Sequence, residues 1–115
     1  MPFAESVPGA TGVELLLGLS MKWARQSGVG LARALAIVTC EPARVLGGAL
    51  GALLAHAGRL VAGGAADLCV FDPDAVWMVN AHSLRSHGKQ TPFSGYELPC
   101  TVRYTIVGGQ IAYQA

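Results

Sequence analysis

The hydrophobic pattern of this 115-residue chain changes its period near Gly58. Before that point, apolar residues recur at the spacing of an amphipathic helix. After it, β-branched and aromatic residues come in short runs that are separated by turn formers. Because helices and strands are segregated along the chain, the sequence taken alone predicts an α+β fold.

The first half predicts three helices, over residues 13–26, 31–38 and 43–46. Gly28 and Gly30 separate the first helix from the second, and Pro42 fits the first turn of the third. The stretch from Gly47 to Ala57, rich in Ala, Gly and Leu, is expected to be a linker.

The second half predicts five short strands, over residues 60–62, 67–71, 76–79, 101–107 and 110–113. Gly108 and Gly109 are expected to form a two-residue hairpin loop between the last two strands. The polar stretch from Asn80 to Pro99 is too long for an ordinary hairpin. A stretch of this kind is expected to be functional or to pack against another part of the protein.

Composition excludes some classes of function and suggests a missing partner. Hydrophobic residues make up 52% of the chain and charged residues 13%, which predicts surface that another domain or another copy covers. The net charge is +1 and the basic residues are scattered, so we expect no nucleic-acid binding. The sequence contains no secretion signal and no uninterrupted membrane-spanning stretch, which predicts a soluble, cytoplasmic protein.

The residues that could carry chemistry have structural explanations. His56, His82 and His87 lack metal-ligand spacing. Asp67 directly precedes a predicted strand, and residues 72–74 (Asp-Pro-Asp) are a turn in which Asp side chains accept bonds from nearby backbone amides. The three cysteines are odd in number and lack paired spacing, so we expect reduced thiols.

The loop of residues 6–12 (SVPGATG) is the strongest candidate for ligand binding from the residues alone. It precedes the first predicted helix, where free backbone amides can hold a carboxylate group. The alternative is a plain connection into that helix.

Several segments together form a wider pattern: residues 2–14 (PFAESVPGATGVE), 40–47 (CEPARVLG), 58–73 (GRLVAGGAADLCVFDP), 89–98 (KQTPFSGYEL) and 105–109 (TIVGG). In this order they resemble the carboxy-terminal part of bacterial dihydroorotases, members of the amidohydrolase superfamily. The ADL and FDP elements occur across the superfamily. The combination of the Pro-Gly loop with K-x-TPF-x-G is narrower and resembles dihydroorotase or close relatives such as allantoinase and hydantoinase.

The resemblance implies a parent protein with a TIM (β/α)8 barrel and a small β-sandwich built from both chain ends. Such a barrel needs about 250 residues, so this chain can hold only its last segment. Residues 1–46 would be the terminal loop and helices of the barrel, residues 47–57 a linker, and residues 58–115 strands of the composite sandwich.

The resemblance also implies a function, the zinc-dependent hydrolysis of dihydroorotate to carbamoyl aspartate in pyrimidine biosynthesis. In the family the metal ligands precede the position of Pro2, so no catalytic or metal-binding residue can be assigned here, and we expect the chain alone to contain no cofactor and to be inactive. Pro8 and Gly9 match the Pro-Gly whose main chain holds the substrate, and they are the predicted substrate-binding residues.

Other interpretations of the resemblance remain open. One is a non-catalytic dihydroorotase-like subunit that assembles with aspartate transcarbamoylase, and another is a different cyclic amidohydrolase. Glu41 stands where the family has Asn, so its carboxylate needs a new partner or exposure to water. Met1 falls just after the expected catalytic Asp, which predicts a truncated product or a fragment, and the uncovered helix faces predict self-association.

Overall fold

The structure, a computed structural model, describes residues 3–5 and 9–115. Its helical elements are η1 (Phe3–Glu5), η2 (Val13–Leu15), α1 (Leu16–Ser27), α2 (Leu31–Val38), α3 (Cys40–Leu46) and η3 (Gly47–Ala55), where η marks a 3-10 helix. Its strands are β1 (Leu68–Asp72), β2 (Trp77–Met78), β3 (Glu97–Leu98), β4 (Thr101–Val107) and β5 (Gln110–Gln114). Helices precede strands, so the predicted α+β content is confirmed.

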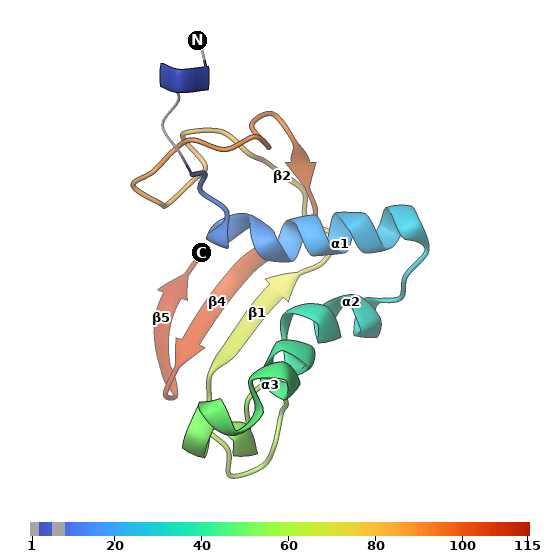
Figure 1. The fold of residues 1–115 in the computed structure, drawn as a ribbon, viewed down its shortest axis with the longest axis vertical. Coiled ribbons are helices and arrows are strands. Elements are labelled where there is room, and N and C mark those ends of the chain that lie inside the picture. Colours follow the sequence, from blue (N-terminus) through green and yellow to red (C-terminus); the bar gives the residue numbers. More distant parts are fainter. Residues whose placement is uncertain (1–2, 6–8) are drawn as a thin grey trace.

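The strands form two separate antiparallel sheets. One sheet has the order β1-β4-β5, and the other pairs β2 with β3. In Figure 1, α1 crosses the middle of the molecule with the three-stranded sheet on one side and β2 on the other, while α2 and α3 run down beside β1. The helix α1 therefore lies between the two sheets and packs toward both.

Two small apolar clusters meet at α1. The first consists of the buried residues Leu15, Val79, Leu84 and Leu98 and joins the start of the helix to the two-stranded sheet. The second consists of the buried residues Met21, Ala24, Ala34 and Cys100 and joins the helix to α2 and to the start of β4. Because these clusters use different faces of one helix, α1 sets the relative position of all the surrounding elements.

The helix boundaries agree closely with the sequence prediction. Gly28 ends α1 in the left-handed conformation (φ 71°), and its N–H donates to the carbonyl of Ala24, as the predicted glycine break requires. The bounds of α2 are those predicted. The third helix begins three residues earlier than predicted, at Cys40, so that Pro42 still lies in its first turn, where no backbone donor is needed.

Three features of the structure differ from the sequence expectations. Residues 60–62 form no strand, because Leu60 is 86% exposed and no strand lies beside it to pair with. The expected linker 47–57 is largely a 3-10 helix, η3. The strand β3 was not predicted, since two residues paired only with β2 give no sequence pattern. The strands β1, β2, β4 and β5 and the Gly108–Gly109 loop are confirmed.

The run Leu31–Leu53 is long and apolar enough to cross a membrane by length and composition alone. The backbone divides this run into shorter pieces. Thr39 leaves the helical region (φ −126°, ψ −86°), and Gly47 and Gly51 have positive φ values of 52° and 58°. The run is thus a series of short helices with changes of direction between them.

The carboxylates of Asp67 and Asp72 hold turns, as predicted. Asp67 Oδ1 accepts a 2.8 Å hydrogen bond from the N–H of Gly108, which fixes the hairpin loop to the start of β1. Asp72 Oδ1 accepts from the N–H groups of Asp74 and Ala75, at 2.9 and 3.3 Å. Neither carboxylate is arranged as half of a general acid and base pair.

The long stretch 80–99 is ordered by its own side chains and by the rest of the fold. Asn80 Oδ1 accepts from the N–H groups of His82 and Ser83, both at 2.9 Å, which starts the turn. Phe93 and Tyr96 pack edge to face with ring centroids 5.4 Å apart. The N–H of Gly95 donates to the carbonyl of Val79 at 2.7 Å, so the stretch returns to pair with β2. The expectation that it packs against another part of the protein is confirmed.

Gly58 provides a test of close packing. A Cβ atom at Gly58 would lie 2.5 Å from Cys40 Cα and 2.8 Å from Thr39 C, at the junction of α2 and α3. Gly63 has a similar positive φ but open space around it. We expect Gly63→Ala to lower the free energy of unfolding by about 1 kcal/mol, the cost of a left-handed alanine. Gly58→Ala should cost roughly 1–3 kcal/mol more, because backbone atoms must move.

Urea unfolding followed by circular dichroism measures both variants. Equal losses of stability in Gly58→Ala and Gly63→Ala would contradict the close contact with the α2–α3 junction.

Asp72 provides a test of pH dependence. The N–H of Asp74 is the main reason that the pKa of Asp72 is lowered, and the positive charge of Arg103 contributes further. A lowered folded-state pKa gives stability that is present above the ordinary value of 3.8 and is lost as the pH falls through the folded-state value. Asp72→Asn keeps the turn acceptor but removes the titration, so unfolding midpoints measured from pH 6 to pH 2 should fall less steeply than in the unmodified chain. Asp74→Asn, which removes an equal charge nearby, is the control, and superimposable acid limbs for Asp72→Asn and the unmodified chain would refute this role.

Candidate functional site

The predicted substrate-binding residues were Pro8 and Gly9. Pro8 lies outside the described residues. Gly9 is exposed and has a positive φ of 97°, and apart from its chain neighbours no described residue has a heavy atom within 4 Å of the position that a Cβ would take. Gly9 begins a segment, Gly9–Gly12, which we term the amino-terminal loop. A glycine with positive φ at an open position leaves the main chain accessible, which suits binding by backbone groups.

The amino-terminal loop is held by a second segment from far along the sequence. The N–H of Thr11 donates to the carbonyl of Gln90 at 2.7 Å, and Thr11 Oγ1 donates to the carbonyl of Gly88 at 2.9 Å. A Cβ atom at Gly88 would lie 2.9 Å from Thr11 Oγ1. Glycine at position 88 therefore permits the close approach of the two segments.

Glu14 holds the same segment at its other end. Its Oε1 and Oε2 atoms accept hydrogen bonds from the N–H groups of Arg85 and Ser86, both at 2.8 Å. We term the residues Arg85–Gln90 the facing loop. Since each carboxylate oxygen accepts a hydrogen bond from a backbone donor, Glu14 acts as a bracket between the two loops.

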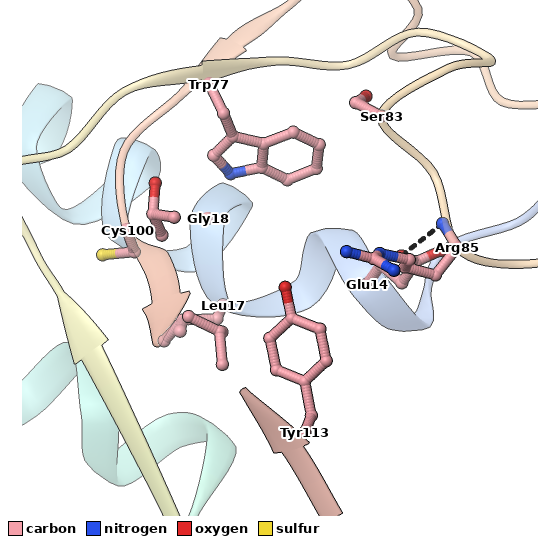
Figure 2. Close-up of a pocket in the computed structure, with 10 residues that line it drawn as sticks. Glu14, Leu17, Gly18, Trp77, Ser83, Arg85, Cys100 and Tyr113 are labelled. Carbon is pink, nitrogen blue, oxygen red and sulfur yellow. Dashed lines mark hydrogen bonds between the residues drawn. The ribbon is translucent and has the colours of Figure 1, made fainter. Parts of the chain in front are cut away.

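A groove of about 470 Å³ lies beside this bracket. Figure 2 shows Trp77 and Tyr113 on two sides of it, with Glu14 and Arg85 at one end. The full lining is Glu14, Leu17, Gly18, Trp77, Ser83, Arg85, Cys100, Thr101, Val102 and Tyr113. The walls are mainly apolar or aromatic, so the groove suits an apolar ligand or an apolar side chain from another chain segment.

Several polar side chains in the groove already have partners. The guanidinium of Arg85 lies over the ring of Tyr113, 5.3 Å from its centroid. The hydroxyl of Ser83 lies 2.8 Å from the carbonyl of Met78 and 3.0 Å from that of Asn80. Burial raises the pKa of the Cys100 thiol, which keeps it protonated and a weak nucleophile. The groove therefore presents no activated nucleophile.

The described residues do not supply a metal centre. No group of three or more His, Cys, Asp or Glu side chains within residues 3–5 and 9–115 could hold a metal ion. Cys40, Cys69 and Cys100 are free thiols. The zinc that the family resemblance implies therefore has no binding site built from the described residues alone.

Glu41 was expected to need a new partner or exposure to water, and it has both. Its carboxylate pairs with the guanidinium of Arg33, from the preceding helix, and its side chain is 30% exposed. The charge that replaces the family's neutral amide has both a partner and contact with water.

Sequence reasoning placed Gly9 correctly in an exposed loop but missed Glu14, Arg85 and Tyr113. Glu14 belongs to the P-G-x-x-G-x-E pattern, which was the only indication of its importance. Arg85 and Tyr113 lie in different segments with no shared motif, so only the folded chain brings them together.

Comparisons with known proteins were made by sequence and by structure. No family model matches the chain. Over 114 residues, or 99% of its length, it is 34% identical to a dihydroorotase of Geobacter metallireducens, of which it covers 25%. It is 40% identical over 113 residues to a dihydroorotase-like protein of Pseudomonas aeruginosa, again covering 25% of that protein. The chain thus spans about a quarter of the length of these relatives.

The fold matches part of a solved enzyme. The chain superimposes on a structure of D-hydantoinase with a TM-score of 0.80 over 94% of its residues, at 19% identity, and covers 22% of that chain. At this identity the match establishes a shared fold only. The arrangement of helices and strands in this chain thus recurs in the D-hydantoinase structure. By sequence, nearly the whole of this chain is similar to about a quarter of dihydroorotases and dihydroorotase-like proteins.

Proposed function

We propose that this chain is the carboxy-terminal part of a dihydroorotase, an enzyme that reversibly hydrolyses dihydroorotate to carbamoyl aspartate in pyrimidine biosynthesis. The supporting observation is the alignment of 99% of the chain with only 25% of the Geobacter metallireducens dihydroorotase. In this proposal, the chain contributes the amino-terminal loop to the substrate site. The rest of the protein contributes the barrel, the metal ligands and the catalytic groups, and the enzyme acts in the cytoplasm.

The exposed surface of the chain supports the proposal that a further part of the protein normally covers it. The accessible surface is 7985 Å², whereas a folded monomer of 11.9 kDa exposes roughly 6,000 Å². The radius of gyration is 16.2 Å, against about 13 Å for a compact domain of this length. Large apolar side chains are left in water, among them Val13, Val45 and Leu60 at 93%, 85% and 86% exposure. Surface of this kind is normally covered by other protein.

The geometry of the amino-terminal loop supports its proposed role. Gly9 offers main-chain groups at an open position, while Thr11 and Glu14 hold the rest of the loop from the other side. Substrate recognition by main chain needs a fixed loop shape and tolerates changes of side chain. This arrangement supports the assignment of substrate binding to Gly9, together with Pro8 from the family resemblance.

The purified chain with added zinc should not hydrolyse dihydroorotate, because it would lack the groups that bind metal and activate water. Grafted in place of the matching quarter of the Geobacter metallireducens dihydroorotase, it should restore dihydroorotate hydrolysis that the shortened enzyme lacks. Hydantoin and allantoin, tested in parallel, distinguish the other cyclic amidohydrolases. Zinc-dependent turnover by the chain alone would overturn the predicted inactivity, and a folded but inactive graft would overturn the assignment to dihydroorotase.

One observation favours a second candidate. The identity to the dihydroorotase-like protein of Pseudomonas aeruginosa, 40%, is higher than the 34% to the dihydroorotase of Geobacter metallireducens. The chain could therefore derive from a non-catalytic dihydroorotase-like subunit that assembles with aspartate transcarbamoylase. An inactive graft combined with co-elution of the chain with aspartate transcarbamoylase in gel filtration would favour this candidate.

The uncovered surface also predicts self-association of the isolated chain. Apolar side chains left in water by the missing remainder can be covered by a second copy. Light scattering over a concentration series from 5 to 500 μM should show a mass that rises above 11.9 kDa. Val45→Glu, which places a charge on an 85% exposed position, should shift this association to higher concentration. A constant monomer mass across the series would contradict the prediction.

A further inference from the structure

Four hydrogen bonds join the amino-terminal loop and its flanking Glu14 to the facing loop, across more than 70 positions of sequence. We propose that Glu14 and Thr11 are positioning residues that make these two loops one mechanical unit, so that the main chain at Gly9 is presented to the substrate in a fixed place. The part that concerns substrate depends on the proposed function. The coupling between the loops does not.

The amino-terminal loop has little else to hold it. Gly9, Ala10 and Gly12 are exposed, and Thr11 is only half-buried, so the loop buries almost no apolar surface. A segment with few buried contacts has low local stability and takes its position from its hydrogen bonds. Among the described residues, the two bonds of Thr11 and the bracket at Glu14 therefore fix the loop, together with the carbonyl of Gly12, which accepts a 3.0 Å hydrogen bond from the N–H of Leu15.

Glu14 is suited to anchor this unit because its own backbone is fixed. The next residue, Leu15, is fully buried in the cluster with Val79, Leu84 and Leu98. A carboxylate can accept from two consecutive backbone amides at once, whereas a glutamine side chain has only one acceptor oxygen. Hydrogen bonds to a charged acceptor are also stronger than those between neutral groups. Glu14 therefore fixes the facing loop relative to the buried cluster that contains Leu15.

The facing loop is anchored independently of Glu14. Arg85 lies over the ring of Tyr113 on β5, and Lys89 Nζ donates to the carbonyl of Leu84, a residue of the first apolar cluster. The loop thus connects the amino-terminal loop to the last strand of the three-stranded sheet. A disturbance at either end of the unit should reach the other, because the coupling between two sites is reciprocal.

The test of coupling uses the chain itself and amide hydrogen exchange measured by NMR. Glu14→Ala should accelerate exchange at Thr11, whose N–H bonds Gln90 and not Glu14, by roughly tenfold, within the usual range of coupling between sites. Thr11→Val should in turn accelerate exchange at Arg85 and Ser86. Glu14→Gln, which keeps the size and one acceptor, should give an intermediate effect. Glu97→Gln removes an exposed carboxylate on β3 and is the matched control.

Exchange at buried amides of α1, such as Met21, separates coupling from loss of fold. An unchanged rate at Met21 together with faster exchange at Thr11 is the expected result. Unchanged exchange at Thr11 in a folded Glu14→Ala variant overturns the coupling. If Glu14→Ala fails to fold, Thr11→Val and Glu14→Gln decide the same question through the amides of Arg85 and Ser86.

The substrate readout uses the same variants in the graft with the Geobacter metallireducens dihydroorotase. Because the positioning residues touch the loop and not the reacting atoms, KM for dihydroorotate should rise roughly tenfold in Glu14→Ala while kcat changes less than threefold. A purely structural role would lower the amount of active enzyme and leave KM unchanged. Coupled exchange with unchanged KM in an active graft overturns the positioning of substrate. An inactive unmodified graft counts against the proposed function and against the substrate part of the inference, while the exchange data still decide the coupling.

Discussion

The burial of α1 on two faces is the constraint on which the rest of the structure depends. One face packs against the cluster at the two-stranded sheet through Leu19. The other face meets α2 and the start of β4 through Met21 and Ala24. Gly18 lies where the helix comes closest to β3, and a Cβ there would be 3.0 Å from Leu98 Cβ. Because α1 packs in both directions, the groove and the bracketed loops at its amino-terminal end have fixed positions relative to both sheets.

The packing of α1 also determines what the groove and the loops beside it can do chemically. Polar groups are engaged in holding backbone, as with Glu14 on two amides beside the groove and Asp67 on the hairpin loop at the other end of the sheet. Their hydrogen-bonding capacity is used to give shape to segments that have few apolar contacts. Under the proposed function, such a chain contributes geometry to a substrate site whose reactive groups come from the rest of the protein; this proposal agrees with its match to a quarter of the Geobacter metallireducens dihydroorotase.

The exposed apolar surface of this chain supports the proposal that other protein normally covers it. The apolar groove and the exposed apolar side chains of α3 and the following segment have no partner within the described residues. Hydrophobic surface left in water favours association, whether with the remainder of a larger protein or with another copy. The same surface explains why the hydrophobic fraction of the sequence is high while few of the described side chains are fully buried.

The sequence by itself determined the local elements. Helical periodicity, Gly28 and Pro42 located the helices, and the alternation of Thr101–Val107 with the Gly-Gly pair located the hairpin, because these features depend on nearby residues. Tertiary structure alone decided the strand β3, the absence of a strand at Leu60, and the meeting of Glu14 with the facing loop. Each of these depends on a partner distant in sequence, and hydrogen-bond pairing across such distances leaves no periodic trace in the chain.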